Sequence, residues 1–286
     1  MMKKLNPSLY VVFFAFAYFS SFAYAERLVM ITGANRGLGL LLSEQFAQGG
    51  DKVIAVHRHN ETPASLNSLK TKYPGKIIME KLDLTDLNEV IKLGEQYRHK
   101  KTPIDILINN AGIYSPREPQ NNTFQNLIQN LPQLEESMHT NAEAPMLLSS
   151  SLLPNITQGT EKMIIFLGSA GSRFSVDDNK RNRMGLTYVM SKSALHKAID
   201  QAATDLKNPQ KCLSQATCKD EQQVTMVGID PGWVDTDMGK GSKNSQPETG
   251  TAEQATKKIY QLITSGTLNH TMSGQLINTS GQKLDW

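Results

Sequence analysis

From residue 27 onward, short apolar runs rich in β-branched residues alternate with segments whose apolar residues recur at helical spacing. Strands are predicted at Leu28–Thr32, Lys52–Val56, Lys76–Leu82, Ile104–Asn109, Lys162–Leu167 and Val224–Ile229, with a weaker seventh at Ser273–Asn278. Helices are predicted at Leu38–Gln48, Ala64–Lys72, Leu87–Tyr97, Leu134–Leu153, Tyr188–Leu206 and Glu248–Thr264. This alternation predicts an α/β fold, a single doubly wound parallel sheet of about seven strands with helices on both faces.

Three polar stretches interrupt the alternation, and we expect them to be insertions or lids rather than core: Tyr114–Leu131, Arg173–Leu186 and Asn208–Gln223. The chain has 286 residues, of which 39% are apolar and 20% charged, so residues 26–286 are expected to form one large domain. A formal charge of +3 argues against a nucleic-acid partner, and six scattered His with two Cys offer no metal site with zinc spacing.

The first 25 residues have the pattern of an export signal. Lys3 and Lys4 precede an apolar run from Leu9 to Phe19, and the segment ends in Ala23-Tyr24-Ala25. We expect cleavage before Glu26 and a periplasmic or secreted protein. The alternative is an uncleaved membrane anchor, because the 17 residues from Leu9 to Ala25 just reach the lower limit for spanning a bilayer. The protein would associate with a membrane only in that case.

Two cysteines, Cys212 and Cys218, lie close together in the polar stretch 208–223. In an exported protein they are expected either to form a short disulfide or to remain two unpaired loop thiols, and the sequence leaves both alternatives open.

A glycine-rich turn follows the first predicted strand and leads directly into a helix. Its residues are Thr32-Gly33-Ala34-Asn35-Arg36-Gly37-Leu38-Gly39. Glycines let the backbone turn tightly and approach a pyrophosphate, while the helix N-terminus supplies amide donors and a positive dipole. The turn therefore predicts a Rossmann-type dinucleotide site, with Gly33, Asn35, Arg36, Gly37, Leu38 and Gly39 as cofactor-binding residues.

The end of the second predicted strand carries His57-Arg58 and no carboxylate. An acidic residue there would bind a ribose 2′-hydroxyl, whereas arginine suits a 2′-phosphate. Arg36 in the glycine turn is expected to add a second cation on that side. We therefore predict NADP rather than NAD as the cofactor; the alternative is that Arg58 is only solvated.

Tyr188 and Lys192 are four residues apart in a predicted helix and so lie on the same face. A free phenol has a pKa near ~10, and a nearby ammonium favours its ionised form. Tyr188 is therefore a candidate general acid/base. The pattern recurs by chance on solvated helix faces, so its meaning depends on the other motifs.

Further motifs follow in order along the chain: Asp83-Leu84 after the third strand, Asn109-Asn110-Ala111-Gly112 after the fourth, and Pro231-Gly232-Trp233-Val234-Asp235-Thr236 after the sixth. With them, residues 27–286 resemble the short-chain dehydrogenase/reductase family, and the C-terminal segment from Ser273 to Trp286 resembles its C-signal/sniffer-like carbonyl reductase branch. The resemblance implies that the cofactor is also bound by Arg58, Asp83, Leu84, Asn110, Ala111, Gly112, Tyr188, Lys192, Pro231, Gly232, Val234 and Thr236.

The same resemblance implies four catalytic positions. Tyr188 would exchange a proton with the substrate oxygen, and Lys192 would lower the pKa of Tyr188 and bind the nicotinamide ribose. Asn141 falls where the family asparagine supports a water relay. Ser169 would hydrogen-bond the substrate oxygen, although the run Gly168-Ser169-Ala170-Gly171-Ser172 departs from the family pattern. An ungapped match places the catalytic serine at Gly168, and Ser172 is the alternative to Ser169.

Together these features predict an NADP-dependent oxidoreductase that interconverts a small-molecule carbonyl and alcohol by hydride transfer. The alternative is an exported, cofactor-binding signalling or regulatory protein with little turnover, because the serine motif is altered and reduced nicotinamide cofactor is scarce outside the cytoplasm. Family members often form homodimers or homotetramers through helices that match Leu134–Leu153 and Tyr188–Leu206, and the resemblance implies such an assembly here.

Overall fold

The computed structural model describes residues 26–115, 121–175, 184–238 and 250–285. The expected export signal at residues 1–25 and the first residues of the helix predicted at Glu248 lie outside the described residues. Among the described residues, no helix combines the length and apolarity needed to cross a bilayer, and no group of three or more His, Cys, Asp or Glu is arranged to hold a metal ion.

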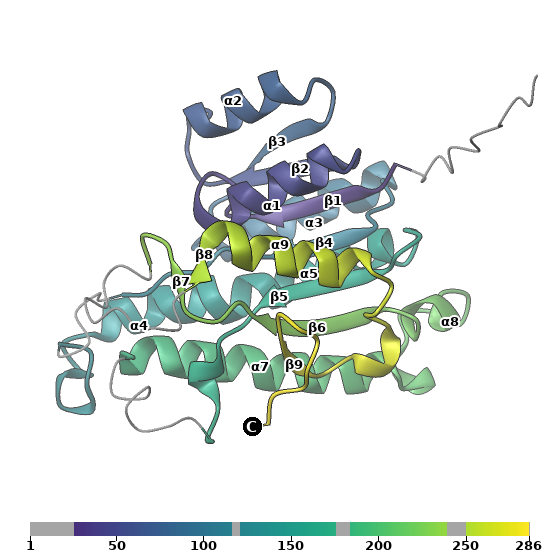
Figure 1. The fold of residues 1–286 in the computed structure, drawn as a ribbon. Coiled ribbons are helices and arrows are strands. Elements are labelled where there is room, and N and C mark those ends of the chain that lie inside the picture. The colour runs from purple at the N-terminus through teal and green to yellow at the C-terminus, as the bar shows by residue number, and fades with distance from the viewer. Residues whose placement is uncertain (1–25, 116–120, 176–183, 239–249, 286) are drawn as a thin grey trace, which may run out of the picture.

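A seven-stranded parallel sheet forms the centre of the fold, as predicted (Figure 1). Its spatial order is β3-β2-β1-β4-β5-β6-β9, so the chain winds outward from β1 in both directions. The strands are β1 (Leu28–Thr32), β2 (Lys52–His57), β3 (Ile77–Lys81), β4 (Ile106–Asn109), β5 (Met163–Leu167), β6 (Thr225–Asp230) and β9 (Leu276–Asn278). A short parallel pair, β7 (Val234–Asp235) and β8 (Gly250–Thr251), lies apart from this sheet.

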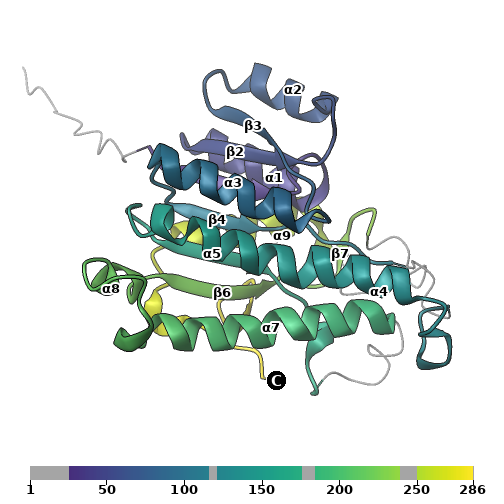
Figure 2. The same cartoon turned by 180° about the vertical axis from the view of Figure 1, so that it is seen from behind.

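Helices cover both faces of the sheet, because neighbouring residues of each buried strand point to opposite sides. One face packs on α1 (Gly37–Gln48), α2 (Ala64–Lys72) and α9 (Ala252–Thr264). The other packs on α3 (Leu87–Lys100), α5 (Ala144–Ile156) and α7 (Leu186–Leu206) (Figure 2). Phe46 and Phe166 are the largest fully buried side chains, one on each side.

The helix predicted at Leu134–Leu153 is longer than expected and is interrupted. It consists of α4 (Leu131–Met138), a π-helical turn η3 (His139–Glu143) and α5. Pro145 stands in the first turn of α5 and has no N–H to donate to the carbonyl of Asn141. The helix widens at this point, as π-turns do at functional sites. The interruption therefore falls at the predicted catalytic asparagine.

The stretch Asn208–Gln223 is a structured insertion between α7 and β6, one of the two alternatives expected from sequence. It contains the 3₁₀ turn η5 (Pro209–Lys211) and the short helix α8 (Cys218–Glu221). Cys212 and Cys218 form a disulfide, which settles the two alternatives left open by the sequence. The buried Glu221 carboxylate accepts hydrogen bonds from Leu213 N and Thr217 Oγ1. The stretch is therefore a compact connection between α7 and β6 that is cross-linked by a disulfide.

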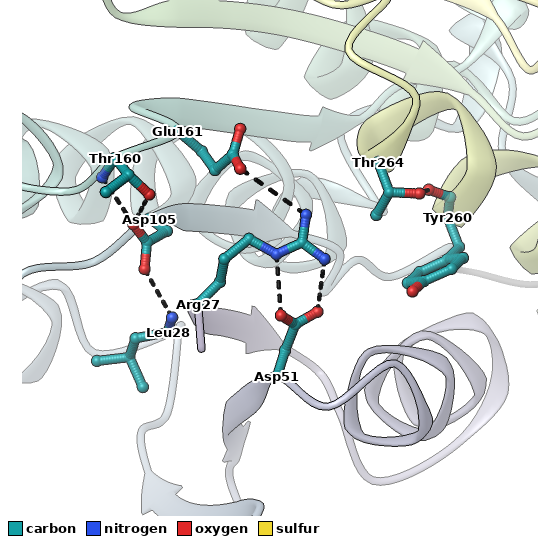
Figure 3. A network of polar contacts seen from close by, with 8 residues as sticks. All are labelled: Arg27, Leu28, Asp51, Asp105, Thr160, Glu161, Tyr260 and Thr264. Carbon is teal, nitrogen blue, oxygen red and sulfur yellow. Dashed lines mark hydrogen bonds and ion pairs between the residues drawn. The ribbon is translucent and has the colours of Figure 1, made fainter. Parts of the chain in front are cut away.

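The described domain begins at a buried polar network on the edge of the sheet opposite the strand C-termini (Figure 3). The Arg27 guanidinium forms a bidentate pair with Asp51, at 2.9 and 2.8 Å. Nearby, the Asp105 carboxylate accepts hydrogen bonds from Leu28 N and from the backbone and hydroxyl of Thr160. Both charges of the Arg27–Asp51 pair are buried and compensate each other, and Glu161 adds a second, longer ion pair to Arg27 at 3.9 Å.

Candidate active site

A cleft of 610 Å³ opens at the carboxyl ends of the strands, and it brings together most of the residues predicted from sequence. Ligands bind at this edge in doubly wound sheets, where the strand order reverses beside β1 and β4. The predicted residues that line it are Gly33, Asn35, Arg36, Gly37, Leu38, Arg58, Asp83, Leu84, Asn110, Ala111, Gly112, Tyr188, Lys192, Pro231 and Thr236. Gly39, Asn141, Ser169, Gly232 and Val234 do not line it directly.

The glycine turn adopts the backbone geometry that its sequence predicts. Gly33 and Gly37 have left-handed φ angles of 66° and 55°, which side chains disfavour. Gly39 lies beneath the turn, where an added Cβ would come within 2.3 Å of Gly33 O and 2.4 Å of Asn110 Nδ2. Gly39 therefore lets helix α1 pack closely against the turn, and the amides at the start of α1 face the cleft as an anion site requires.

The loop after β4 is tied to the glycine turn by one threonine and one asparagine. Thr32 Oγ1 accepts hydrogen bonds from both Asn110 N and Ala111 N, each at 3.1 Å. Asn110 Nδ2 donates to Thr32 O at 2.7 Å. The predicted Asn110, Ala111 and Gly112 thus form a wall of the cleft that is fixed to β1.

At the far end of the cleft, His57, Arg58 and Asp83 lie at the ends of β2 and β3. Burial opposes ionisation of Asp83, but hydrogen bonds from Thr85 and the charge of Arg58 hold the pKa of that carboxyl below its usual value. Arg58 therefore lies within electrostatic range of Asp83. The expected second cation, Arg36, is ion-paired at 3.1 Å with Asp237, on the segment that follows Thr236.

Tyr188, Lys192 and Ser169 meet at the other end of the cleft. Lys192 is only 5% exposed, and its Nζ lies 5.9 Å from the centroid of the Tyr188 ring and donates to Leu167 O at 2.8 Å. Ser169 lies close enough to Tyr188 to act on the pKa of its phenol, and its hydroxyl accepts from Gly171 N at 3.2 Å. The four-residue spacing on α7 and the end of β5 thus place three polar groups together, as predicted.

Burial dominates the acid–base properties of this cluster. It raises the pKa of Tyr188 to about 12, although the hydrogen bond from Ser169 opposes the shift. It lowers the pKa of Lys192 to about 8, against the attraction of Asp230. Burial is therefore the largest influence on the pKa of Tyr188, and the lowering of this pKa by Lys192 stays a prediction.

A buried histidine explains why the serine motif departs from the family pattern. His196 Nε2 accepts from Ser169 N at 3.3 Å, so Nδ1 carries the ring proton and faces Ser172 Oγ at 2.5 Å. Burial, with the charge of Lys192, lowers the pKa of His196 to about 3 and keeps the ring neutral. A Cβ at Gly168 would lie 2.5 Å from His196 Nε2. Ser172 is thus hydrogen-bonded to His196, whereas Ser169 lies close enough to Tyr188 to influence its pKa.

Asn141 is 1% exposed and supports the cleft from behind. Its Oδ1 accepts from Ile113 N at 2.8 Å, and its Nδ2 donates to Ile113 O and to Ser191 Oγ. The side chain thus links the loop after β4 to helix α7, one residue before Lys192. The described contacts give Asn141 a structural function; the water relay stays a prediction.

The cleft also contains residues that the sequence analysis did not select. Tyr114 and Ser115 follow the predicted Asn110–Gly112 segment directly, and Thr140 precedes Asn141 with Glu136 one helical turn earlier. Their position next to recognised motifs is the sequence signal that could have identified these residues. Their side-chain directions depend on the loop path and on the π-turn, which a motif does not reveal.

Comparisons with known proteins agree with this geometry. The short chain dehydrogenase family profile matches residues 27–247. A carbonyl reductase from chicken fatty liver with bound NADPH is 25% identical and covers 91% of this chain and 99% of its own, with a TM-score of 0.75. The carbonyl reductase Sniffer of D. melanogaster is 26% identical and covers 91% of this chain and all of its own (100%), with a TM-score of 0.70.

Among curated relatives, benzil reductase ((S)-benzoin forming) of Saccharomyces cerevisiae is 28% identical over 245 residues, 85% of this chain and 84% of the relative. A fatty acyl-CoA reductase of Acinetobacter baylyi is 28% identical over 206 residues, 70% of this chain and 61% of the relative. This chain thus spans about three fifths of the Acinetobacter protein.

The profile match covers well over half of the chain, so the protein belongs to the short-chain dehydrogenase/reductase family. It is an NAD(P)-dependent oxidoreductase with a carbonyl reductase-like fold.

Proposed function

We propose that this protein reduces a small-molecule carbonyl compound to an alcohol with NADPH and that Tyr188 supplies the proton. The observation that carries the proposal is that Tyr188 and Lys192 line the same cleft as the glycine turn, with Ser169 close enough to Tyr188 to act on its pKa. This is the arrangement that protonation and stabilisation of a carbonyl oxygen require.

The residues present fit a dinucleotide. The left-handed glycines and the amides at the start of α1 suit a pyrophosphate, and Gly112 leaves the Lys192 ammonium within reach of the cleft. When bound, the cofactor would supply the hydride. Tyr188 would then give its hydroxyl proton to the carbonyl oxygen as the C–H bond forms, while Ser169 hydrogen-bonds the same oxygen and Lys192 stabilises the phenolate that remains.

Reduction is the direction that the acid–base state of the cleft supports. A phenol with a pKa of about 12 is protonated at neutral pH and can serve as an acid without prior ionisation. Oxidation of an alcohol needs the phenolate, which is a fraction of only ~10⁻⁵ of such a group at pH 7. Cofactor binding that lowers this pKa would make both directions accessible.

Arg58 supports NADP over NAD. Its charge acts at the end of β2 beside Asp83, where an arginine suits a ribose 2′-phosphate. We expect NADPH to bind more tightly than NADH and Arg58→Ala to lose about tenfold or more of this difference, the value of a charge-assisted hydrogen bond.

The test is a panel of aromatic diketones, aromatic aldehydes and aliphatic ketones with loss of NADPH absorbance as the readout. The panel begins with benzil, named for the yeast relative's activity. Tyr188→Phe should lower kcat by about 10²–10⁴-fold, the contribution of a positioned acid, with NADPH affinity little changed. Full turnover in Tyr188→Phe would refute the assigned role. A wild-type protein that binds NADPH but reduces nothing in the panel would favour the binding or regulatory alternative.

We further propose that residues 1–25 are an export signal removed before Glu26. The Cys212–Cys218 disulfide supports this, because disulfides persist in oxidising compartments and are rare in reducing ones. Mass spectrometry of the mature N-terminus in soluble and membrane fractions tests it. A chain that retains residues 1–25 in the membrane fraction would instead establish an anchor.

A further inference from the structure

Helix α7 carries Tyr188 in its first turn, yet it has no cap of its own. Its N-cap residue is Gly185, which has no side chain to accept from the exposed amides of the first turn. A helix end buried without such acceptors is destabilised, so the acceptors must come from elsewhere in the fold.

They come from the loop after β4, more than sixty residues earlier in the chain. Tyr114 Oη accepts from Gly185 N at 2.7 Å. The backbone carbonyl of Asn122 accepts from Leu186 N at 2.9 Å, and its side-chain Oδ1 accepts from Thr187 N at 2.9 Å. Three consecutive amides that lead up to Tyr188 are thus satisfied by two residues of another segment.

Both polar atoms of the Asn122 side chain form hydrogen bonds in this contact. It is 2% exposed, and its Nδ2 donates to Thr187 Oγ1 at 2.8 Å and to Ser115 O at 3.2 Å. Thr187 Oγ1 in turn donates to Ser115 O at 2.6 Å. A Cβ at Gly185 would lie 2.2 Å from Asn122 Nδ2, so glycine is needed there for Asn122 to fit.

The same segment also contacts the tyrosine ring. Tyr114 lies with its ring centroid 5.1 Å from that of Tyr188, tilted by 51°, and both Tyr114 and Ser115 line the cleft. Tyr188 is therefore held through its helix turn by Asn122 and through its ring by Tyr114.

We propose that Asn122 is a positioning residue that caps helix α7 from the loop after β4 and thereby fixes Tyr188 for proton transfer. It also couples the cleft wall at Tyr114 and Ser115 to the catalytic helix, so a substrate pressing on this wall acts on the position of Tyr188. The catalytic part of the inference rests on the proposed reductase function; the capping part does not.

The experiment compares Asn122→Ala and Asn122→Asp with Asn155→Ala in the full-length protein. Asn155 is a matched control, because it is 1% exposed and donates to two backbone carbonyls, of Tyr97 and Thr102, near the start of β4. Asp at 122 retains an acceptor for Thr187 N and adds a negative charge that a helix N-terminus favours.

Two readouts are taken: amide hydrogen exchange of residues 185–187, and kinetics with NADPH and benzil or the best substrate of the panel. In Asn122→Ala we expect exchange in this turn to accelerate by about tenfold or more and kcat to fall by about tenfold, while the NADPH dissociation constant changes less than about twofold. Asn122→Asp keeps the acceptor for Thr187 N and should recover part of the exchange protection, but it loses the Nδ2 donor to Ser115 O and should recover less of the activity. Asn155→Ala should lower thermal stability and leave both readouts near wild type.

The proposal fails if exchange at residues 185–187 in Asn122→Ala matches that in Asn155→Ala, or if the loss of activity lies wholly in KM. Should the wild type reduce no carbonyl compound, the proposed function fails, and the exchange measurement still decides whether Asn122 caps the helix. Gly185→Ala provides a second test, because its Cβ must displace Asn122 and should reproduce the alanine variant.

Discussion

Substitution of Lys192 tests directly whether burial controls the pKa of this side chain. The ammonium is 5% exposed, and its pKa falls from 10.5 to about 8 on folding. Between these two values the unfolded chain binds more protons than the folded protein, so stability rises with pH in this window. From pH 7 to pH 10 the wild type should gain about 2–3 kcal/mol from this group alone.

Replacing Lys192 by Met removes this contribution, and the loss of the hydrogen bond to Leu167 O is independent of pH. Urea unfolding of both proteins at pH 7 and pH 10 isolates the effect, because all other titrating groups are shared. The wild type should gain about 2 kcal/mol or more relative to Lys192→Met between the two pH values. Lys197→Met is the control, since the Lys197 side chain on the same helix is 73% exposed. A difference between wild type and Lys192→Met that does not change with pH would refute the account of a desolvated ammonium.

Three further predictions follow from individual contacts. Ser169→Ala should lower kcat by about 10²-fold, because Ser169 lies beside Tyr188. Ser172→Ala should lower kcat much less, because Ser172 is hydrogen-bonded to His196. Equal losses of kcat in the two variants would contradict this assignment. Replacing Cys212 and Cys218 by Ser should lower the free energy of unfolding by about 2 kcal/mol with kcat unchanged, as expected for a short closed loop and as denaturant titration can check. Asp51→Ala should cost about 3–5 kcal/mol, because it removes the bidentate partner of the buried Arg27 guanidinium. Glu26→Ala, which removes an exposed partner of Lys52 and Lys76, should cost far less in the same titration.

The elements of the fold could be predicted from the sequence because each is encoded locally. Apolar runs and helical spacing located all seven strands of the sheet within a few residues. The glycine turn was also a local signal, since positive φ at Gly33 and Gly37 requires a residue without a side chain. The same holds for Tyr188 and Lys192, whose four-residue spacing puts them on one face of α7.

Other features could not be predicted because they depend on how segments distant in the sequence meet. The choice between Gly168, Ser169 and Ser172 depends on His196, which approaches from α7 and occupies the space beside Gly168. The pKa of Tyr188 depends on burial as well as on charge proximity, and the extent of burial is set by the whole cleft rather than by a pair of residues.

The sequence by itself therefore determined the parallel sheet, the nucleotide-binding turn and the pairing of tyrosine with lysine, since each of these follows from periodicity or spacing within a short segment. Only the tertiary structure decided which serine contacts the tyrosine, that Arg36 pairs with Asp237, and that Asn122 caps a helix that begins sixty-odd residues later. The physical reason is that hydrogen bonding and desolvation depend on which atoms approach in space, and no local pattern specifies those neighbours.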